Sequence, residues 1–349
     1  MAANTSLIIA KKLLTEGKMN EKTGVLIINT GTPDAPTQEA IRRYLQEFLM
    51  DPAIIGAPKF IRKRIVNKIV AKRPEKTLNK YERFWTNEGS PFILTSQLQR
   101  RALEEKLLAV TGKNLPVALG MRYGNPSIKS ALEQLKDADC VRIVVVPLYP
   151  QNVNVCAGTC FKKVREELAN FATRGWTPQV LELKSFCSQE DYLEALAQSV
   201  QEAWSYTPGS KLVVSFHSTM MADIKKDNTY VQETQFTARE LAKHLNIPDE
   251  DVILSYQSRF DSRAWLSPFT EQEVKRLAAE GVRDICIICP GFVADNIETL
   301  IDIDVTLKDE VEQLSNGQTH LTYVPALGTN PLLIDALSNA ICELLTHIG

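Results

Sequence analysis

The feature that most constrains the fold is a set of short, almost wholly apolar segments that alternate with segments of helical periodicity. Their apolar residues run continuously instead of at every second position, which is typical of strands buried on both faces of a parallel sheet. The predicted strands are, in chain order, 24–31, 116–123, 141–150, 179–186, 211–218, 252–259, 284–292 and 321–327.

Helix-period segments lie between these strands, for example at 127–137, 190–204, 229–245 and 270–281. Alternation of strands and helices builds parallel sheets with helices on both faces. We therefore predict an α/β protein of two doubly wound, Rossmann-like domains, each with a four-stranded parallel sheet flanked by helices.

The predicted domains are an extension at 1–22, a first α/β domain at 23–155 and a second at 156–328. A final helical segment, 329–349, is expected to pack back on the first domain. A length of 349 residues agrees with two domains of about 150 residues each.

Charge and hydropathy exclude several classes of protein. Forty Lys and Arg residues face 42 Asp and Glu residues, so no domain-wide positive field would attract nucleic acid. The longest apolar runs, such as 143–148, are far shorter than the roughly 18 residues that span a bilayer. The first 20 residues have only a short apolar run before Lys11 and no small-residue cleavage site, which argues against a secretory signal and for a cytoplasmic location.

Cysteine usage indicates free thiols. The chain has seven cysteines, an odd number, and their scatter along a long chain is typical of a reducing compartment. Cys286 and Cys289 form a Cys-x-x-Cys, but on a strand this spacing points the two side chains to opposite faces. We favour core packing for this pair, with a redox or zinc pair as the alternative.

The phosphate-binding signatures of nucleotide enzymes are absent. The sequence contains neither G-x-G-x-x-G nor G-x-x-x-x-G-K-[ST], which disfavours a nicotinamide dinucleotide or a nucleoside triphosphate. Ligands of doubly wound sheets lie beyond the carboxyl ends of the strands, so candidate functional residues are sought where strands end.

His217 is the first candidate. It closes the apolar run at 211–216, whereas the other three histidines lie on a polar helix face, before a late strand and near the C-terminus. An imidazole titrates near neutral pH, which suits proton transfer or metal ligation. A structural role is the alternative for an isolated strand-end histidine.

Glu298 and Asp302 are the second candidates. They are four residues apart in an acidic segment after the predicted strand 284–292, so they would share a helix face, with Asp295 one turn earlier. A solvated acidic helix start is the alternative. Apolar neighbours and the shared domain favour a cleft in which Glu298 meets His217, and such a pair could remove protons from a ligand or hold a divalent metal.

A basic amphipathic segment covers 58–73. It has seven basic and no acidic side chains around an apolar stripe of Ile61, Ile65, Val66, Ile69 and Val70. A solvated helix over a core would explain this pattern. We also weigh a mobile lip at 54–73 that binds an anionic amphiphile or touches a membrane surface.

The sequence resembles the ferrochelatases, which insert ferrous iron into a porphyrin, from about residue 23 to the C-terminus. The resemblance rests on ordered matches at GTPDAPTQEAIRRYLQEFLMDP, WTNEGSPF, GMRYGNPSI, VVPLYPQ, SFHS, YQSRF, WLSP and PGFVADNIETL. It implies a lyase of haem biosynthesis that acts on a porphyrin and ferrous iron.

The resemblance also implies roles for individual residues. His217 and Glu298 take the positions of the catalytic histidine and glutamate, and Asp302 joins them in handling the metal. The residues expected to contact the porphyrin are Thr30, Arg73, Ser90, Arg122, Tyr123 and Trp265. Guanidinium and hydroxyl groups among them suit the propionates of the ring edge.

The sequence departs from the family pattern at three places. Residues 152–156 read NVNVC where an aromatic and Ser/Thr-rich loop is common, 227–230 read DNTY where Gly-Asp-Pro-Tyr is usual, and Thr30 replaces a larger side chain. Some members bind a [2Fe-2S] cluster through C-terminal cysteines. Only Cys342 lies in that region here, so we expect no cluster and no resident cofactor.

The predicted function is insertion of ferrous iron into a porphyrin, with protoporphyrin IX as the expected substrate, in a cleft between the two sheets. One alternative keeps the fold and changes the substrate, to coproporphyrin or to another tetrapyrrole with cobalt. A second alternative is a haem- or porphyrin-binding protein without turnover.

Overall fold

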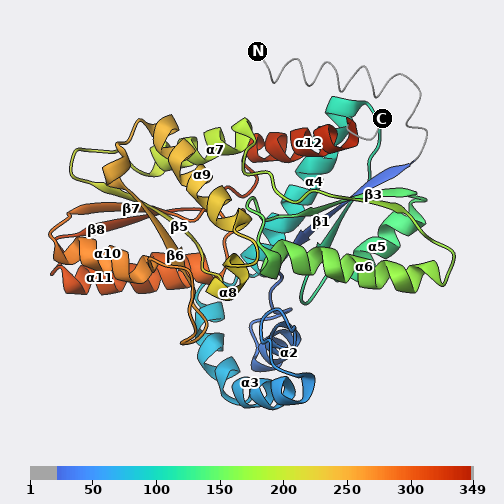
Figure 1. Ribbon diagram of the computed structural model, residues 1–349, viewed down its shortest axis with the longest axis horizontal. Helices are drawn as coiled ribbons and strands as arrows, with labels where there is room; N and C mark the ends of the chain where they lie inside the picture. Colours follow the sequence, from blue (N-terminus) through green and yellow to red (C-terminus); the bar gives the residue numbers. More distant parts are fainter. Residues whose placement is uncertain (1–21, 347–349) are drawn as a thin grey trace. The chain divides into compact units, whose positions relative to one another are not determined.

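The computed structural model describes residues 22–346, so the predicted N-terminal extension lies outside the described residues except for Lys22. The chain divides into two compact units (Figure 1). The first includes the chain up to Leu148, Asn154–Lys184 and the chain from Ile334 onward, and the second includes Tyr149–Val153 and Ser185–Leu333.

The first unit contains a four-stranded parallel sheet in the order β2-β1-β3-β4. Its strands are β1 (Thr23–Asn29), β2 (Val117–Met121), β3 (Arg142–Pro147) and β4 (Gln179–Glu182). Its helices are α2 (Gln38–Leu49), α3 (Lys59–Glu82), α4 (Pro91–Thr111), α5 (Ile128–Asp137), a short π-helix η1 (Asn154–Gly158), α6 (Thr159–Ala172) and most of α12 (Pro331–Thr346). Every residue of β1 is buried, as the continuous apolar run predicts.

The second unit contains a second four-stranded parallel sheet, in the order β6-β5-β7-β8. Its strands are β5 (Lys211–His217), β6 (Val252–Gln257), β7 (Asp284–Ile288) and β8 (His320–Val324). Its helices are α7 (Glu190–Ala203), α8 (Met221–Ile224), α9 (Thr229–Leu245), a short 3₁₀ turn η2 (Asp249–Asp251), α10 (Thr270–Ala279), a π-helix η3 (Glu298–Leu307) and α11 (Lys308–Leu314).

The observed architecture confirms the predicted fold class. All eight predicted apolar segments contain a strand, and the predicted helical segments contain α5, α7, α9 and α10. Capping residues mark where individual helices of the two units begin and end. The Thr37 hydroxyl accepts a hydrogen bond from the Ala40 amide at the start of α2, and left-handed Asn246 ends α9.

The boundary between the units differs from the predicted one. The prediction places residues 156–184 in the second domain, whereas α6 and β4 belong to the first unit. The reason is strand pairing, since β4 adds to the edge of the first sheet alongside β3. The helix α12 also belongs to the first unit from Ile334 onward, and Lys106 of α4 forms a salt bridge with Asp335 at 2.5 Å.

Both sheets have the same strand order, which determines where a ligand site is expected. In each, the second strand of the unit lies on one side of the first and the third lies on the other, so the order reverses between β1 and β3 and between β5 and β7. The crevice at such a reversal, beyond the carboxyl ends of the strands, is where ligands of doubly wound sheets bind.

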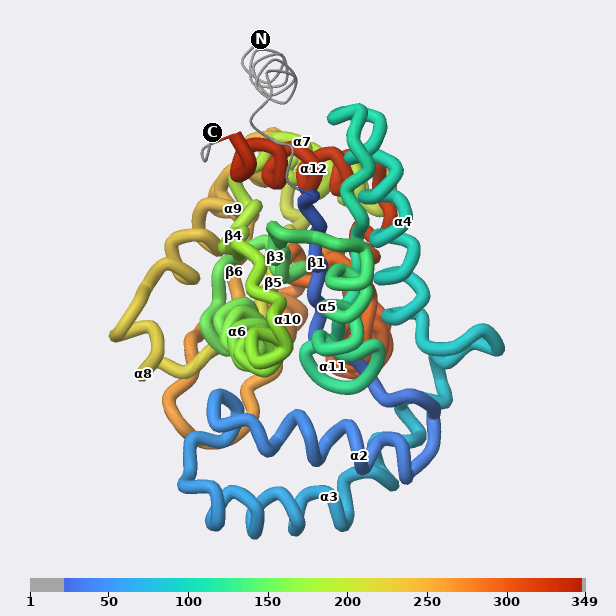
Figure 2. The backbone as a smooth tube through the Cα atoms, turned by 90° about the vertical axis from the view of Figure 1, so that its right-hand side faces the viewer, coloured from blue at the N-terminus to red at the C-terminus, as the bar shows by residue number. Residues whose placement is uncertain are grey.

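Helices α2 and α3 run side by side in the first unit (Figure 2). The core-facing side of α3 carries Arg62, Val66 and Val70, whereas Phe60 and Ile65 are exposed. The apolar stripe expected on this helix therefore divides into a buried row and an exposed row.

Candidate active site

His217 is the last residue of β5, one of the two strands that flank the reversal point of the second sheet. Its Nδ1 lies 2.6 Å from the carbonyl oxygen of Ser218, and the hydroxyl of Tyr230 donates to the carbonyl of His217 at 2.8 Å. When Nδ1–H donates to this carbonyl, Nε2 keeps a lone pair. In that tautomer the Nε2 of His217 is able to accept a proton.

Glu298 begins η3, after the loop that follows β7 on the other side of the reversal point. Its Oε2 lies 3.6 Å from Nε2 of His217, and the side chains of His217 and Glu298 keep 38% and 31% of their surface exposed. The sequence thus predicted a pair that the fold does bring together. A proton taken by the imidazole would be stabilised by the neighbouring carboxylate.

Ser258 is a third member of this group that the sequence analysis did not assign. It directly follows β6, and its hydroxyl donates to Oε2 of Glu298 at 2.5 Å. Ser258 has a φ of 65°, a left-handed conformation that is uncommon for a residue with a side chain. The quoted YQSRF motif was the available signal for it.

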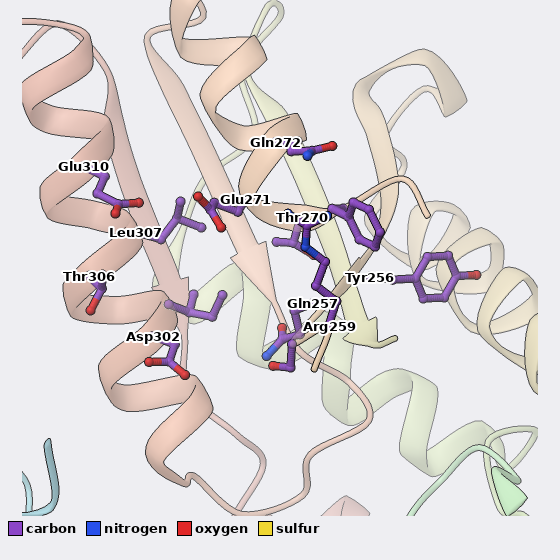
Figure 3. Close-up of a pocket in the computed structure, with 13 residues that line it drawn as sticks. Tyr256, Gln257, Arg259, Thr270, Glu271, Gln272, Asp302, Thr306, Leu307 and Glu310 are labelled. Carbon is purple, nitrogen blue, oxygen red and sulfur yellow. The ribbon is translucent and has the colours of Figure 1, made fainter. Parts of the chain in front are cut away.

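Asp302 lies on the same helix but in different surroundings. It lines a pocket with residues such as Gln257, Arg259 and Glu310, a lining that includes neither His217 nor Glu298 (Figure 3). Glu298 and Asp302 lie on a π-helix, whose hydrogen bonds join residues five apart, and not on the α-helix that their spacing suggested.

Asp295 does not extend this acidic row. It precedes η3 and accepts hydrogen bonds from the hydroxyls of Tyr323 at 2.6 Å and Thr299 at 2.9 Å. These contacts tie Asp295 into the unit's own packing. Between residues 22 and 346, no group of three or more His, Cys, Asp or Glu side chains is arranged to hold a metal ion.

The carboxyl edge of the first sheet holds Thr30, Arg122 and Tyr123, which follow the paired strands β1 and β2. Arg122 forms a salt bridge with Asp51, and the Tyr123 hydroxyl donates to the same carboxylate at 3.1 Å. Burial raises the pKa of Tyr123 far above its usual value, so this hydroxyl stays protonated. The Nε of Arg122 is buried and has no hydrogen-bond partner.

Gly31 lets the backbone turn sharply at this edge. It has a φ of 103°, and a Cβ atom there would lie 1.8 Å from the carbonyl oxygen of Tyr123. Only glycine fits such an approach. The Gly-Thr-Pro after β1 is therefore needed to hold Thr30 against the residues that follow β2.

The other residues predicted to contact the porphyrin lie on different elements of the chain. Ser90 precedes α4 and is buried, and its hydroxyl has no hydrogen-bond partner. Arg73 is exposed on α3. Trp265 is half-buried in the second unit, where its Nε1 donates to Asp261 at 3.0 Å.

The segments that depart from the family pattern, 152–156 and 227–230, are held by hydrogen bonds. The Asn152 amide donates to Glu233 at 2.5 Å, and Asn154–Gly158 forms η1. Asp227 accepts from the Thr229 amide at 2.9 Å, and Tyr230 keeps its contact with the carbonyl of His217.

The cysteines are mostly core residues. Cys286 and Cys289 are buried, and the Sγ of Cys289 donates to Oε1 of Gln257 at 3.2 Å. Burial raises the pKa of Cys342, on α12, to about 11.

Comparison with known proteins identifies the family. The family model described as Ferrochelatase matches residues 22–345. The chain is 37% identical over 320 residues to a ferrochelatase of Thioalkalivibrio sulfidiphilus, covering 91% of this chain and 85% of that protein. The chain belongs to the ferrochelatase family. Ferrochelatases are metal chelatases of the lyase class that insert metal into a porphyrin.

Other relatives agree. A ferrochelatase of Alcanivorax borkumensis is 37% identical over 323 residues, covering 92% of this chain and 93% of that protein. Among solved structures, the fold is similar to SirB from Bacillus subtilis with Fe3+, at a TM-score of 0.54 and 13% identity over 93% of this chain and 95% of that chain. A cobalt complex of the sirohydrochlorin chelatase SirB from Bacillus subtilis subspecies spizizenii, also 13% identical, covers the same shares with a TM-score of 0.53. These two SirB structures support the fold alone.

Proposed function

We propose that this ferrochelatase inserts ferrous iron into protoporphyrin IX, with His217 and Glu298 as its catalytic residues. The observation that carries the proposal is the pairing of His217 Nε2 with Glu298 Oε2 at the reversal point of the second sheet. Iron is a substrate in this reaction. The chain needs no resident cofactor for it.

The reaction must remove two protons. Each of two pyrrole N–H groups loses its proton, and the nitrogen electron pairs become bonds to Fe2+, so that haem and two protons are the products. His217 accepts a proton at Nε2, and Glu298 stabilises the resulting imidazolium and passes the proton on. Ser218 holds the tautomer that makes this possible.

A planar porphyrin presents its nitrogen lone pairs poorly because they point into the ring. The protein must therefore bend the ring, and binding of the ring edges offsets that cost. We propose Thr30, Arg73, Ser90, Tyr123 and Trp265 as edge contacts. Arg122 joins them through its unpartnered Nε, while its Nη2 is held by Asp51.

We also propose that Asp302 helps to move metal or protons toward Glu298. It lies four residues further along η3, which for a π-helix is slightly less than one turn. Its carboxylate faces a pocket, whereas the Glu298 carboxylate faces His217.

Two other functions make different demands on the site. A chelatase for coproporphyrin would keep His217 and Glu298 and differ in the ring-edge contacts. A porphyrin-binding protein without turnover would not need a proton acceptor beside a carboxylate. The His217–Glu298 pair favours an enzyme. Because the sequence departs from the family pattern at Thr30 and 152–156, the identity of the porphyrin substrate is what needs to be tested.

The test is anaerobic incubation with ferrous iron and either protoporphyrin IX or coproporphyrin III, following the loss of porphyrin fluorescence. We expect loss with protoporphyrin IX and a lower kcat/KM with coproporphyrin III. The reverse preference would assign the coproporphyrin reaction. Binding of both rings without an iron-dependent loss of fluorescence would contradict the proposed enzyme.

We propose that the segment 54–73, which includes the first part of α3, contacts an anionic membrane surface. Phe60 is 72% exposed and Ile65 is 37% exposed, and the exposed cations Lys63 and Arg64 lie beside them. Apolar and cationic side chains together are what bind such surfaces. Arg62 is excluded from this surface because it is buried. Within the described residues, no helix is long and apolar enough to cross a membrane.

Liposome co-sedimentation tests this contact. A variant with Lys63, Arg64 and Lys68 changed to Ser should bind anionic liposomes less than the parent, and the parent's binding should weaken as salt rises. A control with three other exposed cations of the first unit changed to Ser, Lys129, Lys162 and Arg174, should bind like the parent. Equal binding by both variants would contradict a specific role for α3.

A further inference from the structure

The first turn of α3 lacks the groups that usually satisfy the start of a helix. Its N-cap is Pro58, which makes no side-chain cap, and the turn carries no acidic residue. The first helical hydrogen bond runs from the Arg62 amide to the Pro58 carbonyl at 2.9 Å. The amides of the three residues before Arg62 therefore have no acceptor within the helix, and the helix dipole favours an anion beside them.

Arg62 is an independent sign of a bound anion. It is only 8% exposed, although its neighbours in the chain, 58–61 and 63–65, are all exposed. Its Nε and Nη1 are buried and have no hydrogen-bond partner among residues 22–346. These two nitrogens carry three of the five N–H donors of a guanidinium. A buried charge without a partner is costly, and an anion would compensate it.

The carboxylate closest to Arg62 in the sequence is engaged elsewhere. Asp51 is the one acidic residue between positions 50 and 74. It pairs with Arg122, and it accepts hydrogen bonds from the Tyr123 hydroxyl at 3.1 Å and from the Ala53 amide at 2.8 Å. Asp51 is therefore not available to Arg62.

The free amides and the guanidinium belong to the same end of the helix. Side chains of an α-helix lean toward its N-terminus and cover the turn before their own Cα. Arg62 is the fourth residue of α3, so its side chain is directed toward the turn that carries the free amides. One anion placed at this end of the helix could accept from both.

The surroundings of this turn indicate which anion it is. Phe60 and Ile61 are 72% and 40% exposed, and the cations Lys59 and Lys63 are exposed beside them. A small soluble anion would make no use of exposed apolar side chains. The phosphate of a lipid headgroup would, because apolar side chains of an interfacial helix insert next to the headgroups.

We propose that the first turn of α3 binds the phosphate of an anionic phospholipid headgroup, between the amides of Lys59, Phe60 and Ile61 and the guanidinium of Arg62. The inference rests on the proposed membrane contact of 54–73 and adds a defined binding site to it. The exposed cations attract the membrane from a distance, whereas Arg62 binds one phosphate through charge-assisted hydrogen bonds. Binding through Arg62 therefore persists at a salt concentration that screens the exposed cations.

The experiment is co-sedimentation of the full chain with phosphatidylglycerol vesicles at about 0.5 M salt, where the Debye length is about 4 Å. Arg62→Met removes the charged donors and keeps a long unbranched side chain, and it should weaken binding about tenfold. The matched control is Arg64→Met, which removes an exposed arginine from the same helix and should change binding by less than about twofold at this salt.

Thermal unfolding without vesicles checks the fold of Arg62→Met. Because the substitution removes a buried charge that has no partner, its Tm should be no lower than that of the parent. A lower Tm would show that the fold itself satisfies Arg62 and would overturn the headgroup site.

Two further measurements distinguish other anions. Vesicle binding that Arg62→Met leaves unchanged, together with a rise in Tm on adding inorganic phosphate to the parent alone, would assign the site to a soluble anion. Porphyrin affinity, measured by fluorescence quenching, should be the same in Arg62→Met and the parent. A tenfold loss of that affinity would assign Arg62 to a propionate of the ring. Either result would overturn the lipid.

The outcomes also separate this site from the proposed membrane contact. If the Ser variant of Lys63, Arg64 and Lys68 loses binding at low salt while Arg62→Met binds like the parent at both salt concentrations, the membrane contact stands and the headgroup site fails. If the parent itself does not bind the vesicles at low salt, the membrane contact is contradicted, and the headgroup site with it.

Discussion

The two sheets have the same strand order, yet their carboxyl edges are built differently. At the first, Arg122 pairs with Asp51 and Tyr123 donates to the same carboxylate, and the side chains of the ion pair are only 13% and 7% exposed. At the second, His217 and Glu298 lie 3.6 Å apart and are 38% and 31% exposed.

This difference shows that the strand order determines where a site can lie, whereas the side chains at that place determine its chemistry. The charges of the first edge are satisfied by one another and contribute to a fixed shape. The pair at the second edge is open, and Nε2 of His217 has no proton to give when Nδ1 donates to Ser218. We therefore expect substitutions at the first edge to change stability and porphyrin binding, and those at the second to change turnover.

The largest effect is expected at His217. His217→Ala should lower the turnover number by about a hundredfold or more, the usual scale for a general base, with porphyrin binding retained. Fluorescence loss measures turnover, and quenching on titration measures binding. His244→Ala is the control, because His244 is held by Glu240 and Glu190 on the same unit. Turnover near the parent's in His217→Ala would remove the proposed role.

The second-largest effect is a loss of stability expected at the carboxyl edge of the first sheet. Arg122→Met leaves the Asp51 carboxylate charged in a buried setting, so the free energy of unfolding should fall by about 3 kcal/mol. Denaturant unfolding checks this value, and adding Asp51→Leu should restore much of the stability. A stable Arg122→Met protein with a much lower kcat would show that this edge also takes part in the chemistry.

The third effect compares the two carboxylates of η3. Glu298→Gln should lower kcat by about tenfold, because it removes the charge that stabilises protonated His217. Asp302→Asn should have a smaller effect on kcat, since Asp302 lines the pocket instead. Steady-state kinetics over a range of pH measures both. An unchanged pH profile in Glu298→Gln would argue against its part in proton movement.

The smallest effect is expected at Asp261. Hydrogen bonds from Arg263, and then from Trp265, lower the Asp261 pKa to about 2 from its usual 3.8. A lowered pKa in the folded state contributes stability that is present above about pH 4 and lost as the pH falls toward 2. Tryptophan fluorescence should report this change near Trp265 and lose it in Asp261→Asn. Identical acid titrations of the two proteins would contradict the contact.

The sequence predicts the fold well where burial decides it. Continuous apolar runs locate all eight strands because both faces of each sheet are covered. The sequence does not predict the boundary between the units, because β4 belongs to the first sheet through its pairing with β3. A local sequence pattern does not show which strands pair. The π-helix is missed for a similar reason, since η3 has the composition of an α-helix.

The candidate site divides in the same way. His217 could be predicted because it ends an apolar strand, and Glu298 because it lies in the acidic segment that follows another one. Ser258 could not, because its contact with Glu298 spans 40 positions and a serine after a strand is common. The partner of Arg122 was missed too, since Asp51 is 71 positions away.

The return of α12 to the first unit has a consequence for synthesis on the ribosome. Most of the second unit, Ser185–Leu333, lies between β4 and the part of α12 that belongs to the first unit, so it can emerge and fold before the first unit receives its last buried helix. Until α12 arrives, the apolar surface that covers Leu337 and Ile341 is open to other molecules in the cell. A nascent chain halted before Ile334 would hold His217 and Glu298 in place and still be a target for chaperones and proteases.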